Sequence, residues 1–175
     1  MSLPPIEALE AGARRIAARI PEVPLDQTLA VRLMILLGRE MSARLDQWLR
    51  PAGLTEVELR ALVTVFSQGD AGSFPGELCE ALGQSPANIT RVTDALVARA
   101  LITRVPSDED RRRMELRVTQ SGAELVRDVL PRLGGFSREL LADFDAAELE
   151  QLLGGLRRLV TALEGVAQHT PTEQG

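Results

Sequence analysis

The sequence predicts a mainly α-helical protein with one small β-hairpin, and three observations lead to this prediction. Apolar residues recur every three or four positions through most of the 175-residue chain. Capping residues precede these periodic segments, and Gly or Pro follows them. One short region, residues 101–118, instead alternates apolar and polar side chains around a polar centre, as two paired strands do. With 45% hydrophobic and 26% charged residues, such a chain can bury a globular core.

Two helices are predicted in the N-terminal part of the chain. The first covers about residues Ile6–Ile20 and ends at Pro21, because proline breaks a helix. The second is longer, with Asp26 as its expected N-cap and Pro51 at its end. Its apolar stripe is broad and consists of Leu29, Leu33, Leu36, Leu37, Met41, Leu45 and Trp48.

Thr55 and Glu58 form a predicted capping box at the start of a third helix. In such a box the Thr hydroxyl accepts from the third helical amide, while the Glu carboxylate accepts from the capping amide. A short fourth helix is predicted from Pro75, and Gly83 ends it. The residues expected to face inward on these two helices are Leu59, Leu62, Val63, Phe66, Leu78, Ala81 and Leu82.

A fifth helix is predicted directly after this glycine. Ser85 suits the N-cap and Pro86 the first helical position, and the helix runs to about Arg99. Its expected buried residues are Ile89, Val92 and Leu96. Two short helices separated by a tight turn that contains glycine are typical of a helix-turn-helix.

The alternating region predicts a hairpin behind this motif. Residues Leu101–Val105 form the first expected strand, and Met114, Leu116 and Val118 alternate with Glu115 and Arg117 in the second. Residues 106–113 between them are too polar for a core, so they form a charged tip.

Two helices are predicted after the hairpin. Thr119 is the expected cap of the first, which Pro131 and the glycine pair at 134–135 should kink or interrupt. A second capping box, Asp145 with Glu148, opens the last helix, in which leucines repeat at threes and fours. The residues from 168 onward are polar and form a tail.

The titratable residues exclude several kinds of chemistry. All 20 basic residues are Arg, the only His is His169 in the tail, and Cys79 is the only Cys. Catalytic triads, Lys Schiff bases, Walker-type phosphate loops and Cys/His zinc sites therefore each lack an essential residue. We expect no enzyme, no cofactor and no metal, the remaining enzyme alternative being carboxylate chemistry by Glu77, Glu80 and Asp94.

The location expected for the chain is cytoplasmic. One unpaired Cys suits a reducing compartment. No stretch approaches the roughly 20 apolar residues of a membrane span. The N-terminus lacks the basic-then-apolar order of a signal peptide.

Charge is distributed unevenly along the chain. The formal net charge of −5 argues by itself against a nucleic-acid binder. Residues 84–119, however, hold seven Arg against five acidic residues, a local charge of +2. The average over the chain therefore hides a basic segment that coincides with the fifth helix and the hairpin.

The exposed face of the fifth helix has the side chains that a DNA recognition helix needs. They are small, polar or forked, so they can enter a major groove about 12 Å wide and meet base edges. Asn88 or Arg91 suits bases, whereas Ser85 and Thr90 suit phosphates. The expected DNA-facing residues are Ser85, Ala87, Asn88, Thr90, Arg91 and Asp94. The alternative is an ordinary amphipathic surface helix.

The hairpin tip adds a second expected DNA contact. An Arg-bearing hairpin directly after a recognition helix can insert guanidinium groups into the adjacent minor groove, where the potential is most negative. The expected residues of this wing are Arg104, Asp110, Arg111, Arg112 and Arg113. The alternative is a merely solvated tip, the usual fate of charge runs.

These residues resemble the MarR family of winged-helix regulators. The resemblance covers roughly residues 26–167 and is most specific in Asp110-Arg111-Arg112, followed by Thr119 and Gly122. Other matching residues are Leu78 through Gly83, Ser85, Asn88, Thr90 and Arg91. Pro5-Ile6-Glu7, Ala81-Leu82-Gly83 and Val129-Leu130-Pro131 resemble the EmrR/MprA branch. Two departures are Ser107, where many members have Asp, and Ala100, where Gly is common.

The resemblance implies a homodimer that binds a pseudo-palindromic operator through two winged helices, with Asp110 orienting Arg112 for the minor groove. For the branch it implies repression of a multidrug-efflux operon, released by small lipophilic or phenolic compounds. The alternative is a repressor of aromatic-compound catabolism or of oxidative-stress genes. A ligand pocket is expected where the dimer helices meet the winged domain, lined by Met34, Leu37, Met41 and Phe66. A rival switch is oxidation of Cys79.

The expected organisation of the chain follows from these elements. Residues 1–25 form an N-terminal helical extension and residues 26–50 a dimerisation helix. Residues 51–120 form the winged helix-turn-helix domain, residues 121–168 the C-terminal dimerisation helices, and residues 169–175 a polar tail. Apolar helices at both chain ends exceed what one small core needs, so association of subunits is expected. The alternatives are a monomeric helical bundle and a dimer that scaffolds a partner without binding DNA.

Overall fold

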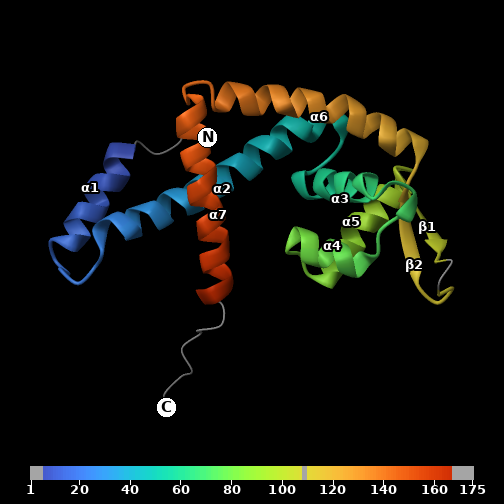
Figure 1. Cartoon of the computed structure of the whole chain (residues 1–175), viewed down its shortest axis with the longest axis horizontal. Helices are drawn as coiled ribbons and strands as arrows, with labels where there is room; N and C mark the ends of the chain where they lie inside the picture. Colours follow the sequence, from blue (N-terminus) through green and yellow to red (C-terminus); the bar gives the residue numbers. More distant parts are fainter. Residues whose placement is uncertain (1–5, 108–109, 167–175) are drawn as a thin grey trace, which may run out of the picture. The chain divides into compact units, whose positions relative to one another are not determined.

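The computed structural model describes residues 6–107 and 110–166, and the expected polar tail, 169–175, lies outside them. The chain divides into two compact units, the first extending to Val126 and the second beginning at Arg127. The described residues are mainly α-helical, with one antiparallel pair of strands (Figure 1). The predicted fold class is therefore confirmed.

The N-terminal helices are α1 (Ile6–Ala17) and α2 (Leu25–Leu49), which contact each other. α1 ends three residues earlier than predicted. The expected Asp26 cap is wrong, because extended Pro24 occupies the N-cap position and makes no side-chain cap bond. Asp26 instead lies in the first helical turn, where its negative charge favours the helix dipole.

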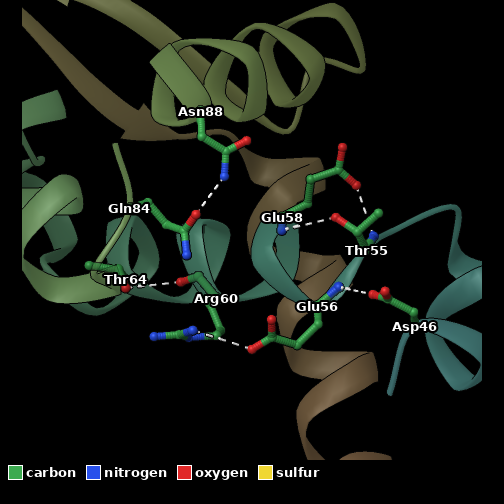
Figure 2. Close-up of polar contacts among 8 residues, drawn as sticks. All are labelled: Asp46, Thr55, Glu56, Glu58, Arg60, Thr64, Gln84 and Asn88. Atoms are coloured by element: carbon green, nitrogen blue, oxygen red, sulfur yellow. Dashed lines mark hydrogen bonds and ion pairs between the residues drawn. The ribbon is translucent and has the colours of Figure 1, made fainter. Parts of the chain in front are cut away.

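A tight connection joins α2 to α3 (Glu56–Ser67). A 3₁₀ turn (Arg50–Ala52) follows α2 and ends at Gly53, whose φ of 67° lies in the left-handed region. The predicted capping box is confirmed, since the Glu58 amide donates to Thr55 Oγ1 at 3.3 Å and the Thr55 amide donates to Glu58 Oε2 at 2.8 Å. Asp46 of α2 also accepts from the amide of Glu56 at 2.6 Å, as Figure 2 shows.

The helix-turn-helix consists of α4 (Pro75–Leu82) and α5 (Pro86–Ala98), after a second 3₁₀ turn (Gly69–Ala71). Gly83 ends α4 with a φ of 62°, and Ser85 caps α5 by accepting from the Asn88 amide, both as predicted. One expectation is wrong: Ala81 is exposed, because Leu78 and Leu82 alone supply the buried face of this two-turn helix.

The wing is formed by β1 (Ile102–Pro106) and β2 (Met114–Val118). β1 begins and ends one residue later than the first predicted strand. A further bridge joins Ser73 to Leu116. The expected alternation is only partly correct. Met114 is exposed, whereas Glu115 is buried and bonds the guanidinium of Arg117 at 2.7 Å. The ion pair lets a carboxylate occupy a buried position.

The core of the first unit lies among α3, α4, α5 and the wing. Ten apolar side chains from these elements and the end of α2 are at most 1% exposed, namely Leu49, Ala61, Leu62, Val65, Leu78, Ile89, Val92, Leu96, Ile102 and Leu116. Ile89, Val92 and Leu96 face this core as predicted. Burial of one face of α5 leaves its opposite face at the surface, and the core therefore sets which side chains α5 presents.

The junction between α5 and β1 contains a strained residue. Ala100 has a φ of 55°, the only non-glycine in the described residues with a positive φ. Its carbonyl accepts from Thr119 Oγ1 at 2.6 Å and from Ser121 Oγ at 2.8 Å, which fixes the start of the next helix there. The departure noted at this position is thus explained: glycine adopts the left-handed conformation at lower cost than alanine.

We predict that Ala100→Gly raises the free energy of unfolding by about 0.5 kcal/mol, because relief of the left-handed strain exceeds the added entropy of the unfolded chain. Urea denaturation at a fixed protein concentration measures the difference. A loss of stability would show that Ala100 is not strained.

The second unit contains the end of α6 (Gln120–Leu140) and α7 (Ala146–Val166). Of the two effects expected of Pro131 and the glycine pair at 134–135, a kink or an interruption, the interruption is wrong, because the helix continues through Pro131 to Leu140. The capping box at α7 is confirmed: the Asp145 amide donates to Glu148 Oε2, and the Glu148 amide donates to Asp145 Oδ1, both at 2.9 Å. No helix among the described residues is long and apolar enough to cross a membrane.

Candidate nucleic-acid interface

The outward face of α5 carries the predicted recognition residues. Five of the six are exposed, namely Ser85, Ala87, Thr90, Arg91 and Asp94, whereas Asn88 is half-buried. The hydroxyl of Thr90 donates to the Pro86 carbonyl at 2.9 Å, which leaves its methyl group as the free end of the side chain. The helix therefore presents small groups around one long cationic side chain.

Three of the polar side chains at this face form a continuous chain. Asn88 Nδ2 donates to Gln84 Oε1 at 2.6 Å, a contact drawn in Figure 2. Asn88 Oδ1 accepts from Arg91 Nη2 at 3.0 Å and from Arg91 Nε at 3.3 Å. Sequence reasoning placed Asn88 and Arg91 on one face but did not find that they bond each other.

Arg104 of β1 lies against α5. Its Nη2 donates to Asp94 Oδ1 at 2.5 Å and to Thr93 Oγ1 at 2.8 Å. The pair joins the base of the wing to the recognition helix across ten residues of sequence. In this arrangement the positive charge of Arg104 neutralises Asp94.

The wing tip is a compact turn shaped by backbone bonds. The Arg113 amide donates to the Asp110 carbonyl at 2.8 Å, and the Arg112 amide donates to Asp110 Oδ1 at 3.0 Å. The Asp110 carboxylate thus holds the turn that carries Arg112. Arg111, Arg112 and Arg113 are all exposed, and the guanidinium of Arg113 lies 3.9 Å from the ring centroid of Phe74, a cation–π contact.

Arg99 contributes a link that sequence reasoning missed. Located at the C-cap of α5, it donates to the carbonyl of Gly53 and, at 2.8 Å, to that of Ala52. In the sequence, the contact is indicated only by a lone Arg at the end of a helix. The contact was missed because its partners lie 46 and 47 residues away along the chain. This contact ties the recognition helix to the 3₁₀ turn that follows α2.

The four expected pocket residues lie on two helices that contact each other. Met34, Leu37 and Met41 are on α2, and Phe66 is on α3. Leu37 is 53% exposed and Met41 40% exposed, while Met34 and Phe66 are half-buried. Cys79 is partly buried in α4.

The fold and the site define a winged helix-turn-helix protein: α4 and α5 form the helix-turn-helix, and β1 and β2 form a wing whose tip exposes arginine. Residues 52–113 match the sequence profile of the MarR family. Over 152 residues the chain is 33% identical to the transcriptional repressor MprA of Escherichia coli, with 87% of this chain and 86% of MprA covered. The chain belongs to the MarR family of transcriptional regulators.

Two further proteins are similar to the chain. The chain is 27% identical over 127 residues to the multiple antibiotic resistance protein MarR of Salmonella typhimurium, covering 70% of this chain and 86% of that protein. A mutant of Escherichia coli MarR, solved in complex with operator DNA, matches with a TM-score of 0.69 at 22% identity, covering 79% of this chain and 99% of that one. This last likeness shows the shared fold.

Proposed function

We propose that this chain forms a homodimer that represses transcription by binding a pseudo-palindromic operator through α5 and the wing. The observation that carries the proposal is the exposed face of α5 beside an Arg-bearing wing on one folded unit. A recognition helix in the major groove and a wing arginine in the minor groove together contact bases and backbone. The solved DNA complex of a MarR mutant with the same fold supports this mode.

Exposed apolar rows on the terminal helices support the homodimer. On α7 they comprise Leu152, Leu153, Leu156, Leu159, Val160 and Leu163, which are 36–68% exposed. Apolar rows of this size on a globular chain usually mark an interaction surface. Two recognition helices held one DNA turn apart, about 34 Å, would match an operator with two half-sites.

The regulated genes proposed are those of a multidrug-efflux operon, with small lipophilic or phenolic compounds as inducers. The names of the relatives support this: one is a transcriptional repressor and another a multiple antibiotic resistance protein. The proposed ligand site is formed by Met34, Leu37, Met41 and Phe66, because flexible Met side chains suit varied apolar ligands. A ligand releases the operator if it binds more tightly to a dimer with the wrong half-site spacing.

A mobility-shift assay with the region upstream of the gene tests operator binding. We expect a shift by a dimer, and an affinity that falls steeply as salt increases, since phosphate contacts release counterions. A scrambled duplex of equal length is the control. Equal affinity for both duplexes, or binding by a monomer, would contradict the proposal.

A second prediction concerns Arg104, which was expected to face DNA. We predict that Arg104→Ala weakens operator binding because it frees the Asp94 carboxylate to repel nearby phosphates. Adding Asp94→Ala should then restore most of the affinity. If Arg104 contacts DNA directly, the double variant will bind no better than Arg104→Ala; fluorescence anisotropy with one operator duplex distinguishes these results.

A further inference from the structure

The hydrogen-bonded chain on α5 occupies both ends of the Asn88 amide. Its donor group is bonded to Gln84 and its acceptor oxygen to Arg91. An Asn side chain recognises adenine by accepting from N6 and donating to N7 at the same time. In this arrangement two N–H groups of Arg91 already occupy the oxygen of Asn88, and the Asn88 side chain is half-buried. Asn88 is therefore a poor adenine reader.

The same contacts leave one particular edge of Arg91 available. A guanidinium carries five N–H donors in a planar fork. The edge formed by Nε and Nη2 points at Asn88 Oδ1. The other edge, formed by Nη1 and the outer hydrogen of Nη2, presents two parallel N–H groups. Such a pair matches the O6 and N7 acceptors of guanine in the major groove.

The surroundings of Arg91 favour this use. Asp94 is the only acidic residue of α5, and its carboxylate is bonded to Arg104. One turn before Arg91 on the same face lies Ala87, whose small side chain allows α5 to approach a base pair closely. Arg91 also lies within the first two turns of α5, the part of a recognition helix that contacts base edges.

We propose that Arg91 reads a guanine in each operator half-site through its Nη1/Nη2 edge, and that Asn88 is a positioning residue that holds the guanidinium in place for this contact. The inference rests on the proposed function, operator binding. Of Asn88 and Arg91, the two side chains that the sequence offered as base readers, Arg91 is thus assigned the base contact.

The test begins with the full-length wild-type chain and a pool of duplexes whose randomised centre spans two half-sites. We expect selection to enrich a guanine at one symmetric position of each half-site. Duplexes with single substitutions at every position then give the affinity ratio between guanine and the other bases for each variant. Urea denaturation of each variant verifies that it is folded.

Arg91→Ala should lower the preference for that guanine by roughly 10-fold or more while leaving the preferences at other positions unchanged. Arg91→Lys keeps the charge but lacks the fork, and should also lose much of the preference. The matched control is Arg14→Ala, which removes one cation from α1, where Arg14 pairs with Glu10. A uniform loss of affinity in Arg91→Ala that Arg91→Lys restores would assign the guanidinium to a phosphate and overturn the proposal.

Asn88→Ala should lower the same guanine preference by about threefold or more, and should have no further effect on it in the Arg91→Ala background. A merely structural role would instead reduce affinity for every duplex equally. An adenine preference that disappears in Asn88→Ala but survives in Arg91→Ala would make Asn88 the reader and overturn the proposal.

The failures of the two proposals are distinguishable. If the wild-type chain enriches no sequence from the pool, operator binding is wrong and this inference is wrong with it. If the wild-type chain instead enriches a sequence in which no guanine preference is lost in Arg91→Ala, operator binding stands and only the inference about Arg91 is wrong.

Discussion

Replacing Gly122 with Ala is expected to lower the free energy of unfolding by about 3 kcal/mol, because the new methyl group would overlap backbone atoms. A Cβ at this position would lie 2.0 Å from the Leu101 oxygen and 2.9 Å from its carbonyl carbon. Neither atom is free to move away, since the same oxygen accepts from the Thr119 amide at 3.1 Å. The first turn of α6 is thus packed directly against the start of the wing.

A matched substitution separates this overlap from the general effect of alanine in a helix. Gly76 lies in α4, and a Cβ there would meet nothing within 4 Å. Gly76→Ala should therefore be neutral or stabilising by up to about 1 kcal/mol, the difference in helix propensity. Urea denaturation of both variants at equal concentration gives the comparison. Equal stabilities would show that α6 can shift away from Leu101 at little cost.

The local capping signals were the most predictable part of the structure. Thr55, Ser85 and Asp145 each cap the helix that the sequence assigned to them. Each of these signals lies within four residues, so the chain around it decides the result. The prediction of Asp26 as an N-cap was wrong because extended Pro24 can precede a helix without a side-chain cap. Asp26 lies two residues after this N-cap position and is therefore part of the first turn.

The internal partners of the site residues were not predictable in the same way. Arg104 bonds Asp94 across ten residues and Arg99 reaches Gly53 across 46, so these contacts exist only once the elements have packed. Arg113 similarly lies over Phe74. Several arginines suited to DNA by type are therefore bonded within the protein. The sequence identifies the surface, but packing decides which side chains on it remain available.

The same reasoning applies to the buried Glu115. A strand pattern assigns charged residues to the solvent face, because an unpaired buried charge is costly. Glu115 is buried because Arg117, two residues along the strand, bonds its carboxylate at 2.7 and 2.9 Å. Alternation alone contains no information about such a pair.

Arg112→Ala is expected to reduce operator affinity by about 100-fold, because a homodimer loses one minor-groove cation at each half-site and a loss of about 1.4 kcal/mol at each amounts to that factor. Arg112 is exposed, and its turn is held by the carboxylate of Asp110 through the backbone bond at 3.0 Å. The guanidinium of Arg113, by contrast, lies over an aromatic ring. All three tip arginines are exposed, but Arg112 is the one whose backbone amide is held by the Asp110 carboxylate, and we therefore assign the insertion to Arg112.

Salt dependence distinguishes this loss from misfolding of the wing. Removing one phosphate-neutralising cation from each subunit should reduce the slope of log affinity against log salt by about 2 for the dimer. Arg112→Lys, which keeps the charge but not the planar fork, should restore the slope but only part of the affinity. Arg14→Ala, far from the wing in sequence, should leave both unchanged. Normal binding by Arg112→Ala would show that the wing tip does not enter the groove, and α5 would then carry recognition without it.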